Sequence, residues 1–149
     1  MQTFLPYSSF QDSAEVLDYR RLGKQRVECF QLLKALKQGG GWSRHPAATM
    51  WRGYESALEN YMHACITEWI KRGYNNTMTA RLNPNAKNPP WLGDALFHAS
   101  HRSNLLRKDP VYYNKFNWTE SSDLPYIWPG ASTFFIEPIE PNSIIDTEL

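Results

Sequence analysis

The chain has 149 residues, of which 42% are apolar, so it is long and apolar enough to bury a core without disulfides, and intrinsic disorder is excluded for the body. The net charge of +1 conceals an asymmetry. Residues 1–110 hold 15 of the 16 Lys and Arg residues but only 9 of the 15 acidic residues. This balance is a modest indication of a polyanionic partner, although the charge alone favours a mixed, solvated surface.

Cysteine usage and hydropathy indicate the compartment. Cys29 and Cys65 are too few for a disulfide framework and lack the spacing of a metal site, so we expect two buried free thiols in a reducing environment. No segment is apolar enough to span a bilayer, and the N-terminus lacks the features of a signal peptide. We therefore expect a cytoplasmic protein, without a membrane partner and monomeric.

The first expected helix runs from Asp12 to Gln38. The stretch Asp12-Ser13-Ala14-Glu15 has the form of a capping box, and several later apolar residues fall near one face. Gly23 lies in the highly charged middle of this segment. Because glycine weakens a helix by about 1 kcal/mol relative to alanine, it predicts either a kink or the close approach of another group.

The second expected helix begins near Pro46 and ends before Gly73. Its apolar residues follow helical spacing over more than five turns, which is typical of a core helix: Trp51, Tyr54, Ala57, Leu58, Tyr61, Met62, Cys65, Trp69 and Ile70. Residues 74–90 are rich in Asn and Pro and read as a loop. A third helix is expected from Asp94 to Arg107, with a short helical segment from Val111 to Phe116.

These elements predict an all-α fold. We expect a single compact helical domain over residues 1–130, with three main helices and long loops. Residues 131–149 are acidic and interrupted by proline, and read as an extended C-terminal tail or a strap on the body.

Two groups of residues could carry chemistry. The first helix holds Arg20, Arg21, Lys24 and Arg26, which could neutralise phosphates, or could pair within the helix with Asp18 and Glu28. On the third helix, His98 and His101 can share a face, and His45 lies at a helix start. Three histidines with Glu28 would suffice for a metal-dependent hydrolase. That spacing is common by chance, so we expect neither a metal nor another cofactor.

The segment Val16-Leu17-Asp18-Tyr19-Arg20-Arg21-Leu22, followed by Arg26-Val27, resembles the opening helix of the pyrimidine-dimer DNA glycosylases of the endonuclease V type. The stretch from Ser100 to Leu105 and the aromatic segment from Pro110 to Phe116 are similar to the last long helix of that family and its Trp-Tyr-Lys-Tyr-Tyr segment. The segments MQTFLPY, HPAATMWRGYE, PPWLGD and HRSNLLRKDP look like those of a divergent bacterial and phage branch.

The resemblance implies a helical protein that binds ultraviolet-damaged double-stranded DNA, cuts the glycosylic bond of a pyrimidine dimer, and nicks the abasic site by β-elimination. The nucleophile of the family is the α-amine of the mature N-terminal residue, which forms an imine with the sugar. An α-amine has a pKa near 8, so part of it is unprotonated at neutral pH. A glutamate of the first helix is the acid/base partner, and arginines clamp the kinked backbone.

The sequence departs from the family at two positions. The family has Thr after the initiator Met, whereas position 2 here is Gln, after which Met is usually retained, so the available amine would be that of Met1. Alignment places Arg21 or Gly23, not glutamate, at the catalytic position. Glu28, or Asp18, would have to substitute.

The resemblance therefore implies a DNA glycosylase with AP-lyase activity on damaged or modified pyrimidines. Met1 would be the nucleophile, Glu28 the acid/base and Arg21 an electrostatic partner. The expected DNA contacts are Arg20, Lys24, Arg26, His45, His101, Arg102 and Lys108. The alternative is a non-catalytic DNA-binding module on the same fold, and the metal-dependent hydrolase is less favoured than either.

Overall fold

The protein is described here by a computed structural model, which covers residues 1–130. The secondary structure of these residues consists of helices: α1 (Phe10–Val16), α2 (Tyr19–Gln38), η1 (Gly41–Arg44), α3 (Pro46–Thr49), α4 (Glu55–Lys71), α5 (Ala95–Lys108), α6 (Pro110–Tyr113) and η2 (Asn114–Phe116). The all-α prediction is confirmed, and α2, α4 and α5 are the three long helices. The expected tail, residues 131–149, lies outside the described residues.

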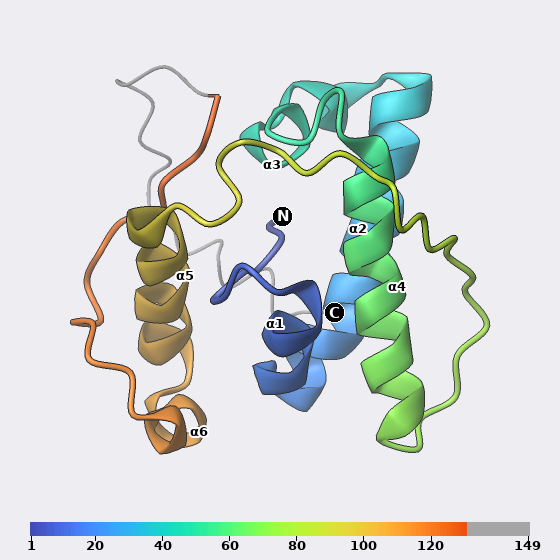
Figure 1. The fold of residues 1–149 in the computed structure, drawn as a ribbon. Coiled ribbons are helices and arrows are strands. Elements are labelled where there is room, and N and C mark those ends of the chain that lie inside the picture. The colour runs from blue at the N-terminus through green and yellow to red at the C-terminus, as the bar shows by residue number, and fades with distance from the viewer. Residues whose placement is uncertain (131–149) are drawn as a thin grey trace.

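The start of the chain lies between two groups of helices. Helix α2 packs along α4, and α1 packs against α4 as well. Helices α5 and α6 stand on the other side, and the N-terminal segment runs between the two groups (Figure 1). The largest fully buried side chains, among them Trp51, Tyr61, Phe97 and Tyr113, come from both sides of this segment. The N-terminal segment therefore lies within the core.

The first helix is two helices, which corrects the prediction of one helix from Asp12 to Gln38. Helix α1 ends at Val16, and α2 begins after Asp18, whose carboxylate accepts a hydrogen bond from the Arg21 backbone N–H at 3.4 Å. The hydroxyl of Tyr113 accepts the Asp18 backbone N–H at 3.0 Å and donates to the Asp18 carboxylate. Asp18 therefore caps α2 and is held by a residue far away in the sequence.

Gly23 does not kink α2, which continues through it. A Cβ atom built at Gly23 would lie 2.9 Å from two carbon atoms of the Trp69 ring. Glycine is thus required for the close approach of that indole, the second of the two predicted possibilities.

The second predicted helix is also divided. Helix α3 begins at Pro46 and ends at Thr49, and α4 begins at Glu55 after a turn that contains Gly53 at a φ of +88°. The third helix is close to the prediction, since Asp94 caps α5 and its carboxylate accepts from the Phe97 N–H at 3.0 Å. Both cysteines are buried and free, as expected.

Candidate active site

The N-terminal segment is held by side chains of α2. The buried Gln25 accepts a hydrogen bond from the Phe4 backbone N–H at its Oε1, at 2.8 Å. Its Nε2 donates to the Gln2 carbonyl, also at 2.8 Å. One amide side chain therefore replaces the two backbone partners that a neighbouring strand would supply.

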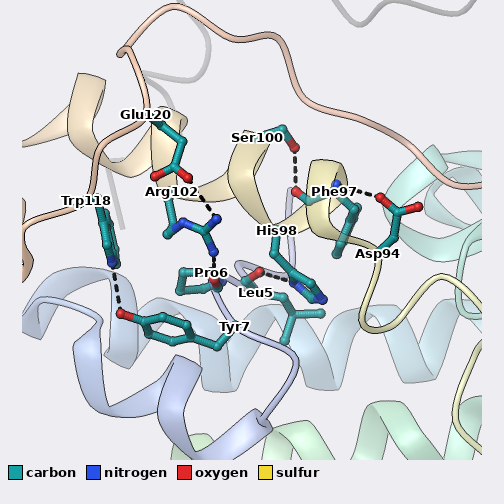
Figure 2. A network of polar contacts seen from close by, with 10 residues as sticks. All are labelled: Leu5, Pro6, Tyr7, Asp94, Phe97, His98, Ser100, Arg102, Trp118 and Glu120. Atoms are coloured by element: carbon teal, nitrogen blue, oxygen red, sulfur yellow. Dashed lines mark hydrogen bonds and ion pairs between the residues drawn. The ribbon is translucent and has the colours of Figure 1, made fainter.

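Two histidines of α5 hold the next residue. The Leu5 N–H donates to His101 Nδ1 at 3.0 Å. His98 Nδ1 lies 2.7 Å from the Leu5 carbonyl oxygen, as Figure 2 shows. His98 Nε2 accepts from the Gly93 N–H at 2.9 Å, so Nδ1 carries the proton and donates. Burial lowers the pKa of His101 to about 3 and also lowers that of His98. Both rings are therefore neutral at pH 7.

Further contacts complete this anchoring. The Tyr61 hydroxyl donates to the Phe4 carbonyl oxygen. Arg102 donates to the Pro6 carbonyl at 2.7 Å and pairs with Glu120 at 2.8 Å, as Figure 2 shows. The Arg102 hydrogen bond is the main reason that the pKa of Glu120 is below its ordinary value. Residues 2–6 are thus fixed by side chains from α2, α4 and α5.

This anchoring brings the start of the chain to a carboxylate. The Gln2 backbone N–H donates to Glu28 Oε1 at 3.2 Å, and Met1 precedes it, partly buried against the core. The other oxygen of Glu28 lies 3.7 Å from the Lys24 ammonium nitrogen. Glu28 is only 6% exposed, so its charge acts in a largely desolvated setting, where electrostatic effects are stronger than in water.

A cavity of about 330 Å³ opens beside Glu28. One face of α2 supplies much of its wall because positions 21, 25 and 28 follow helical spacing. The end of α5 and the N-terminal segment supply the rest. The lining residues are Gln2, Phe4, Asp18, Arg20, Arg21, Lys24, Gln25, Glu28, Lys108 and Asp109. Four of them are basic and three acidic, so the cavity combines phosphate-binding groups with carboxylates.

The two candidate carboxylates of α2 have different surroundings. Asp18 caps the helix, accepts from Tyr113 and pairs with Arg21 at 2.9 Å. Burial and the neighbouring Asp18 charge raise the pKa of Tyr113, so its phenol stays protonated. Both carboxylates line the cavity, but Asp18 is engaged in capping α2, whereas Glu28 contacts the first residues of the chain.

The structure brings together six of the ten predicted site residues. Arg20, Arg21, Lys24, Glu28 and Lys108 line the cavity, and Met1 adjoins it through Gln2. The other four lie elsewhere.

Arg26 faces a neighbouring groove, where its guanidinium lies 4.3 Å from the centre of a Trp69 ring and donates to Asn76 at 2.6 Å. His45 caps α3 by accepting the Ala47 N–H at 3.0 Å.

The remaining two predicted DNA contacts serve the anchoring of residues 2–6. His101 has no exposed surface, so its side chain belongs to the core and not to a DNA-facing surface, which corrects the expectation from its place on α5. The Arg102 guanidinium donates hydrogen bonds to the Pro6 carbonyl and to the Glu120 carboxylate. The charge and spacing of these residues could not reveal that their partners are backbone groups of the N-terminal segment.

Gln25 and Tyr113 hold backbone groups at or near the cavity, and sequence reasoning missed both of them. Gln25 stands four residues after Arg21 and three before Glu28, so its helical register was a usable signal. Tyr113 carried no such signal because its partner, Asp18, is 95 residues away.

Among residues 1–130, no group of three or more His, Cys, Asp or Glu side chains is placed to hold a metal ion. His98 uses both ring nitrogens, and His101 uses Nδ1, in hydrogen bonds to the backbone of Leu5 and Gly93. No helix in the described part of the chain is long and apolar enough to cross a membrane.

Comparison with known families matches residues 1–82 to the family described as pyrimidine dimer DNA glycosylase. The chain belongs to this family. No curated protein and no solved structure matches it. The matched range includes the N-terminal segment and the whole of α2, hence Glu28 and most of the cavity wall. Lys108 and Asp109, which complete the cavity, come from beyond that range. Membership supports an enzyme of DNA repair whose substrate is DNA with pyrimidine dimers.

Proposed function

We propose that the protein removes damaged or modified pyrimidines, pyrimidine dimers first among them, from double-stranded DNA and then cleaves the abasic site. The observation that carries this proposal is the contact between the Gln2 N–H and the Glu28 carboxylate at the wall of a basic cavity. It supports a reaction centre made from the first residue of the chain and one carboxylate of α2.

In the proposed reaction, the Met1 α-amine attacks C1′ of the damaged nucleotide. The new N–C1′ bond forms as the glycosylic bond breaks, and the bonding electrons leave with the base, which takes up a proton. The amine then loses a proton, and its lone pair forms a second bond to C1′ as the C1′–O4′ bond breaks. The ring oxygen O4′ takes up a proton, which leaves the protonated imine of the opened sugar. The Glu28 carboxylate then removes a C2′ proton, and the C3′–O bond breaks with the phosphate as leaving group. Water finally hydrolyses the imine and frees Met1.

The charged residues around the cavity have separate roles in this proposal. Glu28 stabilises the positive charge that develops on the sugar, an effect strengthened by its burial. Arg21, held by Asp18, acts as the electrostatic partner. Arg20, Lys24 and Lys108 bind the phosphates that flank the damaged nucleotide. Arg26, His45 and Arg102 lie outside the cavity lining, so their proposed contacts with DNA lie beyond the cavity.

Borohydride trapping on abasic duplex DNA tests the imine. We expect a covalent adduct, and peptide mapping should place it on Met1. An adduct on Lys24, whose amine also borders the cavity, would refute the role of Met1. Absence of any adduct would refute the lyase step.

Glu28→Gln tests the carboxylate. Because general acid/base catalysis contributes roughly 100- to 10,000-fold, strand cleavage should fall by that order while DNA affinity is retained. Glu15→Gln is the matched control, since Glu15 is an exposed residue of α1 outside the cavity. Equal cleavage by the two variants would remove Glu28 from the mechanism.

A second candidate is a DNA-binding module without catalysis. It is favoured by one observation: both α2 carboxylates of the cavity already pair with basic residues, Asp18 with Arg21 and Glu28 with Lys24. Such a module would bind duplex DNA in a strongly salt-dependent manner and leave ultraviolet-irradiated DNA uncut. Turnover of irradiated DNA would eliminate it.

A further inference from the structure

Gln2 is held at three of the four polar groups that it carries. Its backbone N–H donates to Glu28 Oε1 at 3.2 Å, and its carbonyl accepts from Gln25 Nε2 at 2.8 Å. Its side-chain Oε1 accepts the Thr3 N–H, also at 2.8 Å. These contacts restrain both the backbone and the side-chain amide of a residue that is only 5% exposed. The fourth polar group, Nε2, is therefore held in place as well.

The Gln2 Nε2 group is a buried donor without an acceptor. Within residues 1–130, no group accepts a hydrogen bond from it. A buried polar group without a partner destabilises the folded state, and proteins leave few such groups unpaired. Gln2 lines the cavity beside Glu28, where a bound substrate brings acceptors of its own. The unpaired donor therefore indicates a contact that is made only when the substrate is bound.

The other donor side chains of the cavity differ from Gln2 in charge or are already engaged. Gln2 and Gln25 are the neutral polar residues of the lining, and Gln25 Nε2 donates to the Gln2 carbonyl. The remaining donor side chains of the lining are cationic: Arg20, Arg21, Lys24 and Lys108. Cationic side chains neutralise phosphates, whereas a neutral amide supplies a directional donor for a carbonyl oxygen. Gln2 is thus the neutral donor that can serve the base.

Cleavage of the glycosylic bond creates a charge that such a donor stabilises. When the C1′–N1 bond breaks, its electron pair stays on N1 of the pyrimidine and spreads to the adjacent carbonyl oxygen, O2. In a pyrimidine dimer joined through C5 and C6, the C5–C6 double bond is absent, so the charge cannot spread from N1 to O4. O2 is therefore the oxygen on which the negative charge develops. A hydrogen-bond donor that is already in place at such an oxygen lowers the barrier.

The position of Gln2 in the chain places it near this oxygen. O2 is three bonds away from C1′, the atom that the Met1 α-amine attacks in the proposed reaction. Gln2 follows Met1 directly, so the two Cα atoms are only about 3.8 Å apart. A sugar carbon within reach of the Met1 amine therefore lies beside the Gln2 side chain.

We propose that Gln2 is a further catalytic residue, whose Nε2 donates a hydrogen bond to O2 of the departing pyrimidine. The electron pair of the C1′–N1 bond goes to the base, which later takes up a proton, and Gln2 keeps its own protons throughout. The assignment rests on the proposed function, because it requires that a base is released. It also disfavours an ordinary purine, which has no carbonyl oxygen next to its glycosylic nitrogen.

The test compares two duplexes under single-turnover conditions with the full-length protein, one with a thymine dimer and one with a preformed abasic site. Gln2→Met removes the amide with little change in side-chain length. Only the first duplex has a base to release. The rate of base release, relative to the rate of abasic cleavage, should therefore fall by roughly 100- to 1,000-fold, the range for loss of one oxyanion donor. Met is also a large second residue, and mass spectrometry verifies that Met1 is retained.

Two further variants separate the donor from the fold. Gln2→Glu keeps an oxygen that accepts the Thr3 N–H but, when ionised, has no donor, so its rate ratio should fall as in Gln2→Met. Gln11→Met is the matched control, because Gln11 is an exposed residue of α1 outside the cavity. Its rate ratio should equal that of the wild-type protein.

The outcomes distinguish this assignment from the proposed function. If the wild-type protein processes both duplexes, an unchanged ratio in the Gln2 variants would overturn the assignment alone. An equal fall of both rates would also overturn it, because Gln2 would then only position Met1. A wild-type protein that cleaves the abasic duplex but releases no base would overturn the assignment together with the glycosylase step. Cleavage of neither duplex would overturn the whole proposed function.

Discussion

Replacing Gln25 with leucine should destabilise the protein and release the start of the chain. The substitution keeps much of the side-chain volume but removes the acceptor for the Phe4 N–H and the donor for the Gln2 carbonyl. Both backbone groups lie in a buried segment, and each buried polar group left without a partner costs about 1–3 kcal/mol. The free energy of unfolding should therefore fall by about 2–6 kcal/mol.

Urea unfolding of the full chain measures this loss, and amide hydrogen exchange at Phe4 locates it. Gln31→Ala is the matched control, because Gln31 lies on the exposed side of α2 and should change stability by less than about 0.5 kcal/mol. The reasoning is refuted if Gln25→Leu loses less than about 1 kcal/mol while the Phe4 amide remains protected.

Two further predictions concern the surrounding contacts, and a third concerns pH. Tyr113→Phe should cost about 1–3 kcal/mol in urea unfolding, because the Asp18 N–H loses its acceptor; an unchanged midpoint would contradict this. Gly23→Ala should reduce the free energy of unfolding, although alanine has the better helix propensity, because the new methyl group displaces the Trp69 ring. The same displacement should red-shift the Trp69 emission. A stabilised variant with unchanged emission would argue against the close approach of Trp69 to Gly23.

Below pH 6.5, the free energy of unfolding should fall by up to about 1.4 kcal/mol per pH unit for each buried histidine. The pKa of His101 is about 3 in the folded state, so the unfolded chain binds more protons as the pH drops. His101→Gln should flatten this slope between pH 6.5 and 5, and an unchanged slope would refute the assignment.

The long helices could be predicted because their apolar faces repeat at helical spacing. Leu22, Cys29 and Leu33 point inward on α2, as do Leu58, Tyr61 and Cys65 on α4. The break between α1 and α2 could not be predicted in the same way. Asp18 is fixed by the Tyr113 hydroxyl, a contact across 95 residues, and local spacing carries no information about such a partner.

The candidate site could be predicted where residues of suitable chemistry fall on neighbouring faces of one helix. The charged residues of α2 from Arg20 to Glu28 could be grouped because a helix places them on neighbouring faces, and five predicted residues do line one cavity. The histidines were harder to interpret. Their spacing on α5 is compatible with a metal, with DNA or with structure, and only the position of Leu5 between them decides for structure.

Three of the buried polar residues, Gln25, His98 and His101, meet one requirement of the proposed chemistry. An α-amine can act as a nucleophile only if the first residue has a fixed position, yet chain ends are usually poorly ordered. Fixing each backbone residue costs about 1–2 kcal/mol in conformational entropy, and an extended segment has no internal hydrogen bonds to offset it. Gln25, His98 and His101 supply those bonds from helices whose own backbones are already satisfied. These three side chains thus hold the segment that brings Gln2 to Glu28, as the proposed mechanism requires.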